Sequence, residues 1–509
     1  MILPITPMQY NGFDGLFLLH SAIVIGAAHD SVERQPSPRC HPQTRKVVFE
    51  IILAWTKNAQ RGPRVMWVHG EGGSGKTAIS QTVAEYCAHT GQLGASFFFS
   101  YNKGDLSDGR KLFLTLAYKL AHAIPALRIP ISRAIQYDTT ILSDSPEVQA
   151  EKLIIEPFQT THHPPVPTLV LIDGLDACEG DDMQQRILAI IAQLVVVHKL
   201  PLFFFITSRV STTIQTAFDS TMVRKVSTTI PLDVFTSDEE VRTFLRSEFA
   251  SIRHYHAPVM TTIPEPWPST DVVELLVNKS GGQFLYPSTV VKYVNDPRGN
   301  PAERLVEVVV AAAGQSNLSP TDHLYHHILS NGVGLVGDPS SVLHVLGPLA
   351  CLYAALPPND LALLLGISPG EISEVLGNAA TIEFLTDLNR AGHFWVDLGV
   401  HHAELASGCI RYIDQHLDGL EGINLALYQY TRRRWTKHLD NAIPTVALLE
   451  QLSNPRFVYS RVLPEIEIVI SWLQRIPDIS GDLLYLWQRW ATEQLLQQSP
   501  LSSVRSFSP

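Results

Sequence analysis

The chain alternates between short, unbroken apolar runs and longer stretches in which apolar residues recur every three or four positions. The apolar runs predict strands buried on both faces, at residues 64–69, 93–100, 168–173 and 201–206. The periodic stretches predict helices at residues 46–58, 77–89, 110–123, 145–158 and 184–199. Because helices separate strands that lack polar alternation, this part of the chain is typical of an α/β fold with a parallel sheet covered on both faces.

Strand signals fade beyond residue 230 and helical periodicity dominates. The expected helices are residues 238–253, 272–279, 301–313 and 323–329. A Gly-, Pro- and Ser-rich stretch follows at 331–341, and from residue 401 the chain is helical with many aromatic residues. The sequence therefore predicts that α-helical domains follow the sheet.

The segment that joins the first strand to the next helix fits the phosphate-binding pattern G-x-x-x-x-G-K-[ST]. Its residues are Gly70, Glu71, Gly72, Gly73, Ser74, Gly75, Lys76 and Thr77. The glycines permit positive φ angles, which turn backbone N–H groups inward around an anion. Lys76 can reach the outer phosphates of a nucleotide, and the Thr77 hydroxyl can bind Mg²⁺. We expect a Mg-nucleotide site here; the alternative is a glycine-rich turn without a ligand.

Charged residues follow two later strands at the edge where parallel sheets bind ligands. Asp173 ends the strand 168–173 and is the expected carboxylate partner of Mg²⁺, while Asp176 can orient or deprotonate an attacking water. Arg209 follows the strand 201–206 and can contact a γ-phosphate. Two alternatives stay open: an Asp that only caps the next helix, and an Arg that only forms a surface ion pair.

Composition narrows the class of protein. The chain has 509 residues and a formal net charge of −11, which argues against nucleic acid or an anionic membrane as the main partner. Its five cysteines never occur in C-x-x-C spacing, which favours a reducing compartment without disulfides or a zinc site. The apolar run 16–28 follows no Lys or Arg and is too short to span a bilayer. We expect it to be a strand or buried helix in a cytoplasmic protein, with a secretion signal as the alternative.

Three stretches together resemble a known family. They are VMWVHGEGGSGKTAISQTVAE at 65–85, LVLIDGLDAC at 169–178 and FFFITSR at 203–209, and they resemble the NACHT domain of the STAND class of P-loop NTPases. The stretches at 29–45 and 280–305 are similar to the flanks of the fungal nephrocystin-type NACHT proteins. The resemblance covers roughly residues 29–330 and resumes around 384–406 and 430–439. It implies a P-loop fold followed by helical domains.

The resemblance implies a switch that rests with ADP, exchanges it for ATP, forms a homo-oligomer and activates an effector, often in self/non-self recognition or cell death. It implies that Gly70 to Thr77 bind the phosphates, with Thr77 and Asp173 on Mg²⁺. Asp176 takes the role in hydrolysis and Arg209 that of phosphate sensor. Pro287 corresponds to a proline beside the adenine.

The chain departs from the family pattern in three places. Ala177 stands where the family usually has a glutamate, so we expect slow hydrolysis. The stretch 379–385 reads as a deletion in the family's winged-helix region, which predicts weak retention of ADP and a tendency to self-associate. No recognisable effector domain precedes the NTPase and no repeat sensor follows it, so we expect a truncated or stand-alone core.

These arguments lead to a domain division and a ranked set of functions. The expected domains are a lead-in at 1–45, a nucleotide-binding domain at 46–230, a helical domain at 231–330, a shortened winged-helix-like region at 331–400 and C-terminal helices at 401–509. The first hypothesis is a weak NTPase switch that binds ATP/ADP or GTP/GDP with Mg²⁺, with no nucleic-acid or membrane partner. The second is a nucleotide-bound scaffold that does not hydrolyse, and the third a P-loop kinase or other transferase.

Overall fold

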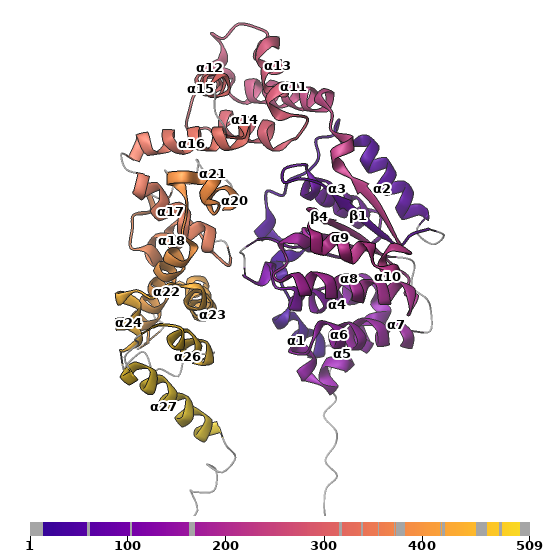
Figure 1. The fold of residues 1–509 in the computed structure, drawn as a ribbon, viewed down its shortest axis with the longest axis vertical. Helices are drawn as coiled ribbons and strands as arrows, with labels where there is room; N and C mark the ends of the chain where they lie inside the picture. Colours follow the sequence, from indigo (N-terminus) through magenta and orange to yellow (C-terminus); the bar gives the residue numbers. More distant parts are fainter. Residues whose placement is uncertain are drawn as a thin grey trace, which may run out of the picture. The chain divides into compact units, whose positions relative to one another are not determined.

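The computed structural model describes most of the chain and divides it into two compact units, Met1–Thr321 and Asp322–Pro509 (Figure 1). The described residues are 14–58, 62–101, 104–161, 168–314, 318–336, 339–354, 356–370, 372, 382–417, 419, 423–454, 466–477 and 481–498. In this part of the chain no single helix has the length and apolar composition to cross a bilayer. A pair of consecutive helical segments, Gly109–Ala123 and Pro125–Tyr137, reaches the required length and apolar composition only when both are taken together, and the two are bent by 119°. All five cysteines are free thiols.

The first unit is built on a five-stranded parallel sheet with the order β2-β3-β4-β1-β5. The strands are β1 (Val65–His69), β2 (Leu93–Phe98), β3 (Thr168–Asp173), β4 (Leu202–Ser208) and β5 (Ser227–Pro231). The predicted α/β fold with four of these strands is confirmed. The fifth was missed because β5 is an edge strand in which only Ile230 is buried, so it lacks an apolar run.

Successive residues of each strand point to opposite sides of the sheet. In the inner strands both sets are mostly apolar and buried, so helices cover both faces. Met66 and Val68 of β1 pack in one core with α2 (Lys46–Asn58) and α3 (Lys76–His89). Val65 and Trp67 pack in the other. That second core is covered by the helices α1 (Asp14–Ala22), α4 (Leu112–Ala123), α5 (Arg128–Tyr137) and α8 (Asp181–Val196). Between α5 and β3 the chain forms α6 (Pro146–Ala150), a π-helical turn (Glu151–Ile155) and α7 (Glu156–Thr160).

The described residues before α2, 14–45, pack within the first unit. The apolar run at 16–28 forms α1 and a short 3-10 turn (Ile25–Ala27), which confirms the buried-helix expectation for its first half. Leu16 and Leu19 of α1 enter the core. The chain then runs along α3: the Cys40 N–H donates to the Thr82 hydroxyl, and Arg39 forms an ion pair with Glu85.

Among the described residues of the first unit, α9 (Thr212–Asp219) and α10 (Thr221–Arg224) lie between β4 and β5, and five more helices lie wholly within the unit after β5. They are α11 (Asp238–Tyr255), α12 (Ala257–Met260), α13 (Thr270–Ser280), α14 (Leu285–Val294) and α15 (Pro301–Ala313). The helix α14 was not predicted, because Pro287 interrupts its apolar pattern; the proline is tolerated since it lies in the first turn. A further helix, α16 (Pro320–Val336), continues across the boundary between the two units and across the predicted boundary at 330/331.

The second unit is a helical body with its own core. Its longer helices are α17 (Pro339–Cys351), α18 (Pro358–Leu365), α22 (Leu398–Gln415), α23 (Leu425–Asn441), α24 (Val446–Leu452), α26 (Ile466–Gln474) and α27 (Gly481–Gln498). The core includes Trp435, Trp472 and Trp487, all almost fully buried. Of the predicted deletion, Ala379 to Thr381 lie outside the described residues, and α20 (Ile382–Leu385) follows directly. The predicted domain boundaries within each unit stay predictions.

Candidate functional site

The phosphate-binding pattern lies between the end of β1 and the start of α3. Gly73 has φ +84° and Gly75 has φ +93°, a region that residues with a side chain rarely adopt. Gly75 is also the residue immediately before α3, so the loop ends at a helix N-terminus whose backbone N–H groups are available to an anion. The loop therefore has the strand–loop–helix geometry of a phosphate site.

Lys76 folds back onto this loop. Its Nζ donates to the carbonyl oxygens of Gly70 and Glu71, both at 2.7 Å. Burial lowers the pKa of Lys76, and the negative charge of Asp176 partly offsets that effect. A phosphate at the loop would offer the ammonium group a charged acceptor in place of two neutral ones.

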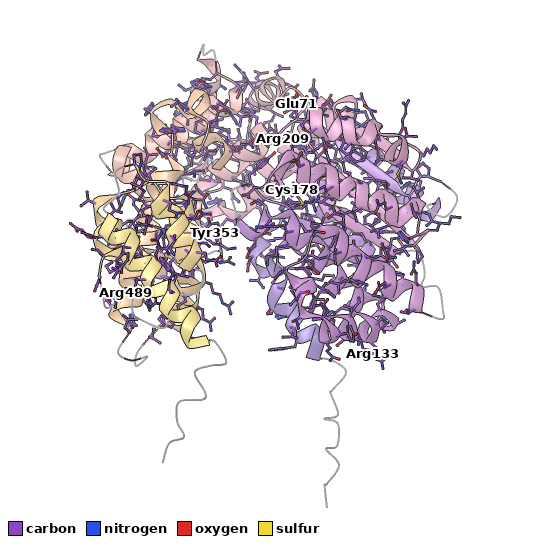
Figure 2. The ribbon with its side chains drawn as sticks, turned by 60° about the horizontal axis from the view of Figure 1, so that its bottom comes forward. Glu71, Arg133, Cys178, Arg209, Tyr353 and Arg489 are labelled. Atoms are coloured by element: carbon purple, nitrogen blue, oxygen red, sulfur yellow. The ribbon has the colours of Figure 1, made fainter. Side chains whose placement is uncertain are left out.

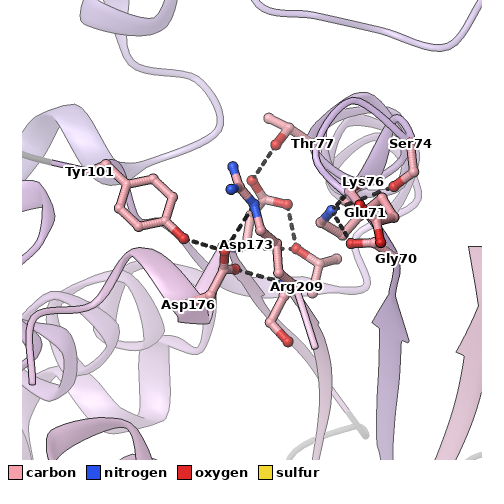
Figure 3. A network of polar contacts seen from close by, with 12 residues as sticks. Gly70, Glu71, Ser74, Lys76, Thr77, Tyr101, Asp173, Asp176 and Arg209 are labelled. Atoms are coloured by element: carbon pink, nitrogen blue, oxygen red, sulfur yellow. Dashed lines mark hydrogen bonds and ion pairs between the residues drawn. The ribbon is translucent and has the colours of Figure 1, made fainter. Parts of the chain in front are cut away.

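Asp173 lies at the end of β3, next to the first turn of α3. Its carboxylate accepts hydrogen bonds from Thr77 (2.9 Å), Ser80 (2.6 Å) and Thr207 (2.6 Å), and the side chain is 2% exposed. Sequence reasoning named Thr77 and Asp173 but missed Ser80 and Thr207, although Ser80 lies one helical turn after Thr77. Figure 3 shows Thr77 and Asp173 facing each other beside Lys76.

The Thr77–Asp173 pair fits Mg²⁺. Two oxygens bound to Mg²⁺ at about 2.0–2.1 Å and at a right angle lie about 2.9 Å apart. The observed distance between Thr77 Oγ1 and Asp173 Oδ2 is 2.9 Å, and both are hard oxygen donors. These two residues would hold the ion beside the phosphate loop.

Asp176 and Arg209 lie beside this pair and contact each other. The Arg209 backbone N–H donates to Asp176 Oδ1 at 2.9 Å, and its Nε lies 3.5 Å from Oδ2. A side-chain carbon added at Gly72 would lie 3.5 Å from the Arg209 guanidinium carbon, so the guanidinium group lies against the phosphate loop. Glu71 and Arg209 lie in the same region of the first unit (Figure 2).

Tyr101 is a member of this cluster that sequence reasoning missed. Its hydroxyl donates a short hydrogen bond to Asp176 Oδ2, and the Arg209 guanidinium carbon lies 5.3 Å from the centre of its ring (Figure 3). Nothing in the local sequence signals this contact, because 75 positions separate Tyr101 from Asp176. Ala177, the departure from the family pattern, is buried next to Asp176 in a 3-10 turn.

The structure also brings the start of α14 to the loop. A carbon added at Gly73 would lie 2.5 Å from Leu285 Cβ, so only glycine permits this packing. Pro287 is buried two residues further along α14. The predicted residues 70–77, Asp173, Asp176 and Arg209 thus gather at one edge of the sheet. Pro287 lies on the helix that packs against the loop, and its contact with a base stays a prediction.

One comparison with known protein families matches the part of the chain that contains this site. Residues 48–209 match the profile of the family described as "Nephrocystin 3, N-terminal". No curated protein sequence matches the chain significantly.

Solved structures with distant similarity include a chain from "Structure of Drosophila ORC bound to DNA". It has 13% identity and a TM-score of 0.36, and the match covers 69% of this chain and 86% of that one. Another is a DNA replication initiation factor, with 11% identity, a TM-score of 0.24, and coverage of 58% of this chain and 81% of that one. Residues 48–209, which contain the phosphate loop, Asp173, Asp176 and Arg209, are thus similar to the nephrocystin 3 N-terminal domain, and they have the strand–loop–helix geometry of a P-loop.

Proposed function

We propose that the protein is a nucleotide-dependent switch of the NACHT/STAND type, which binds ATP/ADP or GTP/GDP with Mg²⁺ in the cytoplasm. The observation that carries this proposal is the convergence of Lys76, Asp173 and Arg209 on one glycine loop. Each of these residues suits a different part of a Mg-nucleotide: the ammonium group the outer phosphates, the carboxylate the metal, and the guanidinium group a terminal phosphate.

The chain's own residues would act as follows. Backbone N–H groups of the loop and of the α3 N-terminus bind the phosphates, and Lys76 exchanges the Gly70 and Glu71 carbonyls for phosphate oxygens. Bound Mg²⁺ would neutralise charge on the phosphates. Arg209 would reach a γ-phosphate by loosening its 3.5 Å contact with Asp176.

We infer that hydrolysis is slow. For hydrolysis, Asp176 must accept a proton from the water whose oxygen attacks the γ-phosphorus as the diphosphate leaves. Both of its oxygens already accept hydrogen bonds, from Tyr101 and from the Arg209 backbone. The second carboxylate that the family pattern supplies is replaced by Ala177.

The hydrogen bonds of Asp176 and the absence of a carboxylate at Ala177 also favour a second candidate function, a nucleotide-bound scaffold that does not hydrolyse the nucleotide. Tyr101 and the Arg209 backbone hold the Asp176 carboxylate in a cluster of protein contacts, and Ala177 supplies no second carboxylate beside it. The two functions differ in their response to nucleotide, since a ligand shifts a two-state equilibrium only when it binds the two states with different affinity.

Size-exclusion chromatography with light scattering separates the two candidates. The switch predicts a larger homo-oligomer with a non-hydrolysable ATP analogue than with ADP, with Lys76→Ala unresponsive to either nucleotide. An oligomeric state that is the same with both nucleotides, in protein shown to bind them, would refute the switch in favour of the scaffold.

A further inference from the structure

Arg45 lies outside the segment that matches the nephrocystin-type family, yet its side chain reaches the phosphate loop. It is 4% exposed, and its Nη2 donates to the carbonyl oxygen of Ser74 at 2.8 Å. Its Nη1 donates to the Phe235 carbonyl at 2.7 Å. The guanidinium group therefore bridges the backbone of the phosphate loop and the backbone just before α11.

The backbone of Arg45 is fixed as firmly as its side chain. Its N–H donates to Glu240 Oε1 on α11 at 2.9 Å, and its carbonyl accepts from the Phe49 N–H in the first turn of α2. Its φ is +55°, a left-handed conformation that costs a residue with a side chain of order 1 kcal/mol or more. Such a conformation persists only where the surroundings determine it, and here two helices do so.

The bond to Ser74 has a direct consequence for phosphate binding. In a planar trans peptide the C=O and the following N–H point in opposite directions. Because Arg45 holds the Ser74 carbonyl, the N–H of Gly75 must point away from Arg45. Gly75 is the residue immediately before α3, so its N–H is one of the donors that a phosphate at this helix end would use.

Arg45 also connects the loop to the helices that follow the sheet. Its guanidinium carbon lies 5.3 Å from the centre of the Phe284 ring, directly before α14. The next residue, Leu285, packs on Gly73 of the loop. Static contacts therefore join Arg45 and the loop to α11 through Glu240, and to the start of α14 through Phe284 and Leu285.

We propose that Arg45 is a positioning residue that orients the Gly75 N–H toward the nucleotide phosphate and transmits the state of the loop to α11 and α14. This inference rests on the proposed function, because it requires a nucleotide at the loop. It assigns to the segment before the P-loop domain a role in both nucleotide affinity and signal transmission.

The test compares the full chain with Arg45→Met, which keeps an unbranched side chain about as far as the position of Nε and removes both Nη donors. Arg39→Met is the matched control, since Arg39 lies in the same segment but pairs with Glu85 on α3. We expect Arg45→Met to weaken Mg-ADP binding by about tenfold, because the Gly75 N–H would no longer be held toward the phosphate and one hydrogen bond to a charged group would be lost. Arg45→Lys keeps the charge but can reach only one of the two carbonyl oxygens that the guanidinium group contacts. Its affinity for Mg-ADP should lie between those of the natural chain and Arg45→Met.

Hydrogen exchange at saturating Mg-ADP supplies the readout that a merely structural role would not change. In the natural chain, nucleotide should protect amides in the phosphate loop and in α11 and α14; in Arg45→Met, protection should remain in the loop and disappear from the two helices. A structural role alone would raise exchange equally with and without nucleotide and leave the difference intact, which would refute the inference. If Arg45→Met does not fold, Arg45→Lys and Phe284→Leu take its place, and the measurement is again whether Mg-ADP protects the amides of α11 and α14.

The two proposals fail in different ways. Absence of Mg-ADP binding by the natural chain would overturn the proposed function and this inference with it. Binding by the natural chain, with affinity and helix protection unchanged in Arg45→Met, would overturn the inference alone.

Discussion

Replacing Arg209 with glutamine should weaken the binding of a nucleoside triphosphate more than the binding of a diphosphate. The guanidinium group lies against Gly72 of the phosphate loop, beyond the end of β4, where a γ-phosphate would lie. Under the proposed function this group contacts the γ-phosphate, a contact that a diphosphate lacks. The substitution should therefore weaken binding of the triphosphate and leave binding of ADP unchanged.

The magnitude follows from the two partners that compete for Arg209. A charge-assisted hydrogen bond to phosphate contributes about 1.5–3 kcal/mol. The ion pair with Asp176 that must loosen is long, at 3.5 Å, and the Arg209 side chain is 36% exposed, so the pair contributes at most about 1 kcal/mol. The phosphate contact prevails by about 0.5–2 kcal/mol, which corresponds to about 2- to 30-fold in affinity.

Isothermal calorimetry with Mg-ADP and with a non-hydrolysable triphosphate analogue measures this difference. Arg39→Gln is the control, because Arg39 also forms an ion pair at the surface, with Glu85 on α3. If Arg209→Gln weakens both nucleotides equally, Arg209 supports the site as a whole and is not a γ-phosphate sensor. If it weakens neither, Arg209 takes no part in nucleotide binding.

Two further outcomes test other parts of the account. Single-turnover hydrolysis should slow at least tenfold in Asp176→Asn while nucleotide affinity stays the same; an unchanged rate would show that Asp176 is not the base. In the second unit, His402 and His438 share a buried 2.9 Å hydrogen bond, and burial lowers the pKa of His402 to about 4 and that of His438 well below its usual value. Because the folded pKa lies below the unfolded one, stability should be full above about pH 6.5 and fall as the pH drops, by about 2 kcal/mol from His402 alone between about pH 7.5 and pH 5. Urea unfolding at the two pH values measures this loss, which His402→Gln should reduce; a pH-independent free energy of unfolding would contradict it.

Local patterns in the sequence predicted the elements of the sheet domain well. The predicted bounds of residues 46–58, 168–173 and 301–313 coincide with α2, β3 and α15. In these segments the apolar period and the punctuating Gly, Pro and Asp residues all indicate the same element. The strand β5 escaped detection because hydrogen bonds to β1, rather than an apolar run, define it.

The site was predictable only where its residues lie on motifs. The phosphate loop, Asp173 and Arg209 could be found because each follows an apolar strand, and parallel strands bring such positions to one edge. Tyr101 and Arg45 could not be found in this way. Their contacts with Asp176 and Ser74 join positions 75 and 29 residues apart, and only the folded chain brings them together.

Binding of Mg-ADP to the natural chain and to Lys76→Ala, measured side by side by calorimetry, tests the central claim most directly. Lys152→Ala is the control, because Lys152 is an exposed lysine paired with Glu156 on a different helical segment. The account predicts that the natural chain and Lys152→Ala bind with the same affinity and that Lys76→Ala binds about 10- to 150-fold more weakly, the loss expected for a charged contact to phosphate of about 1.5–3 kcal/mol. Equal affinity in all three proteins, or no binding by the natural chain, would contradict it.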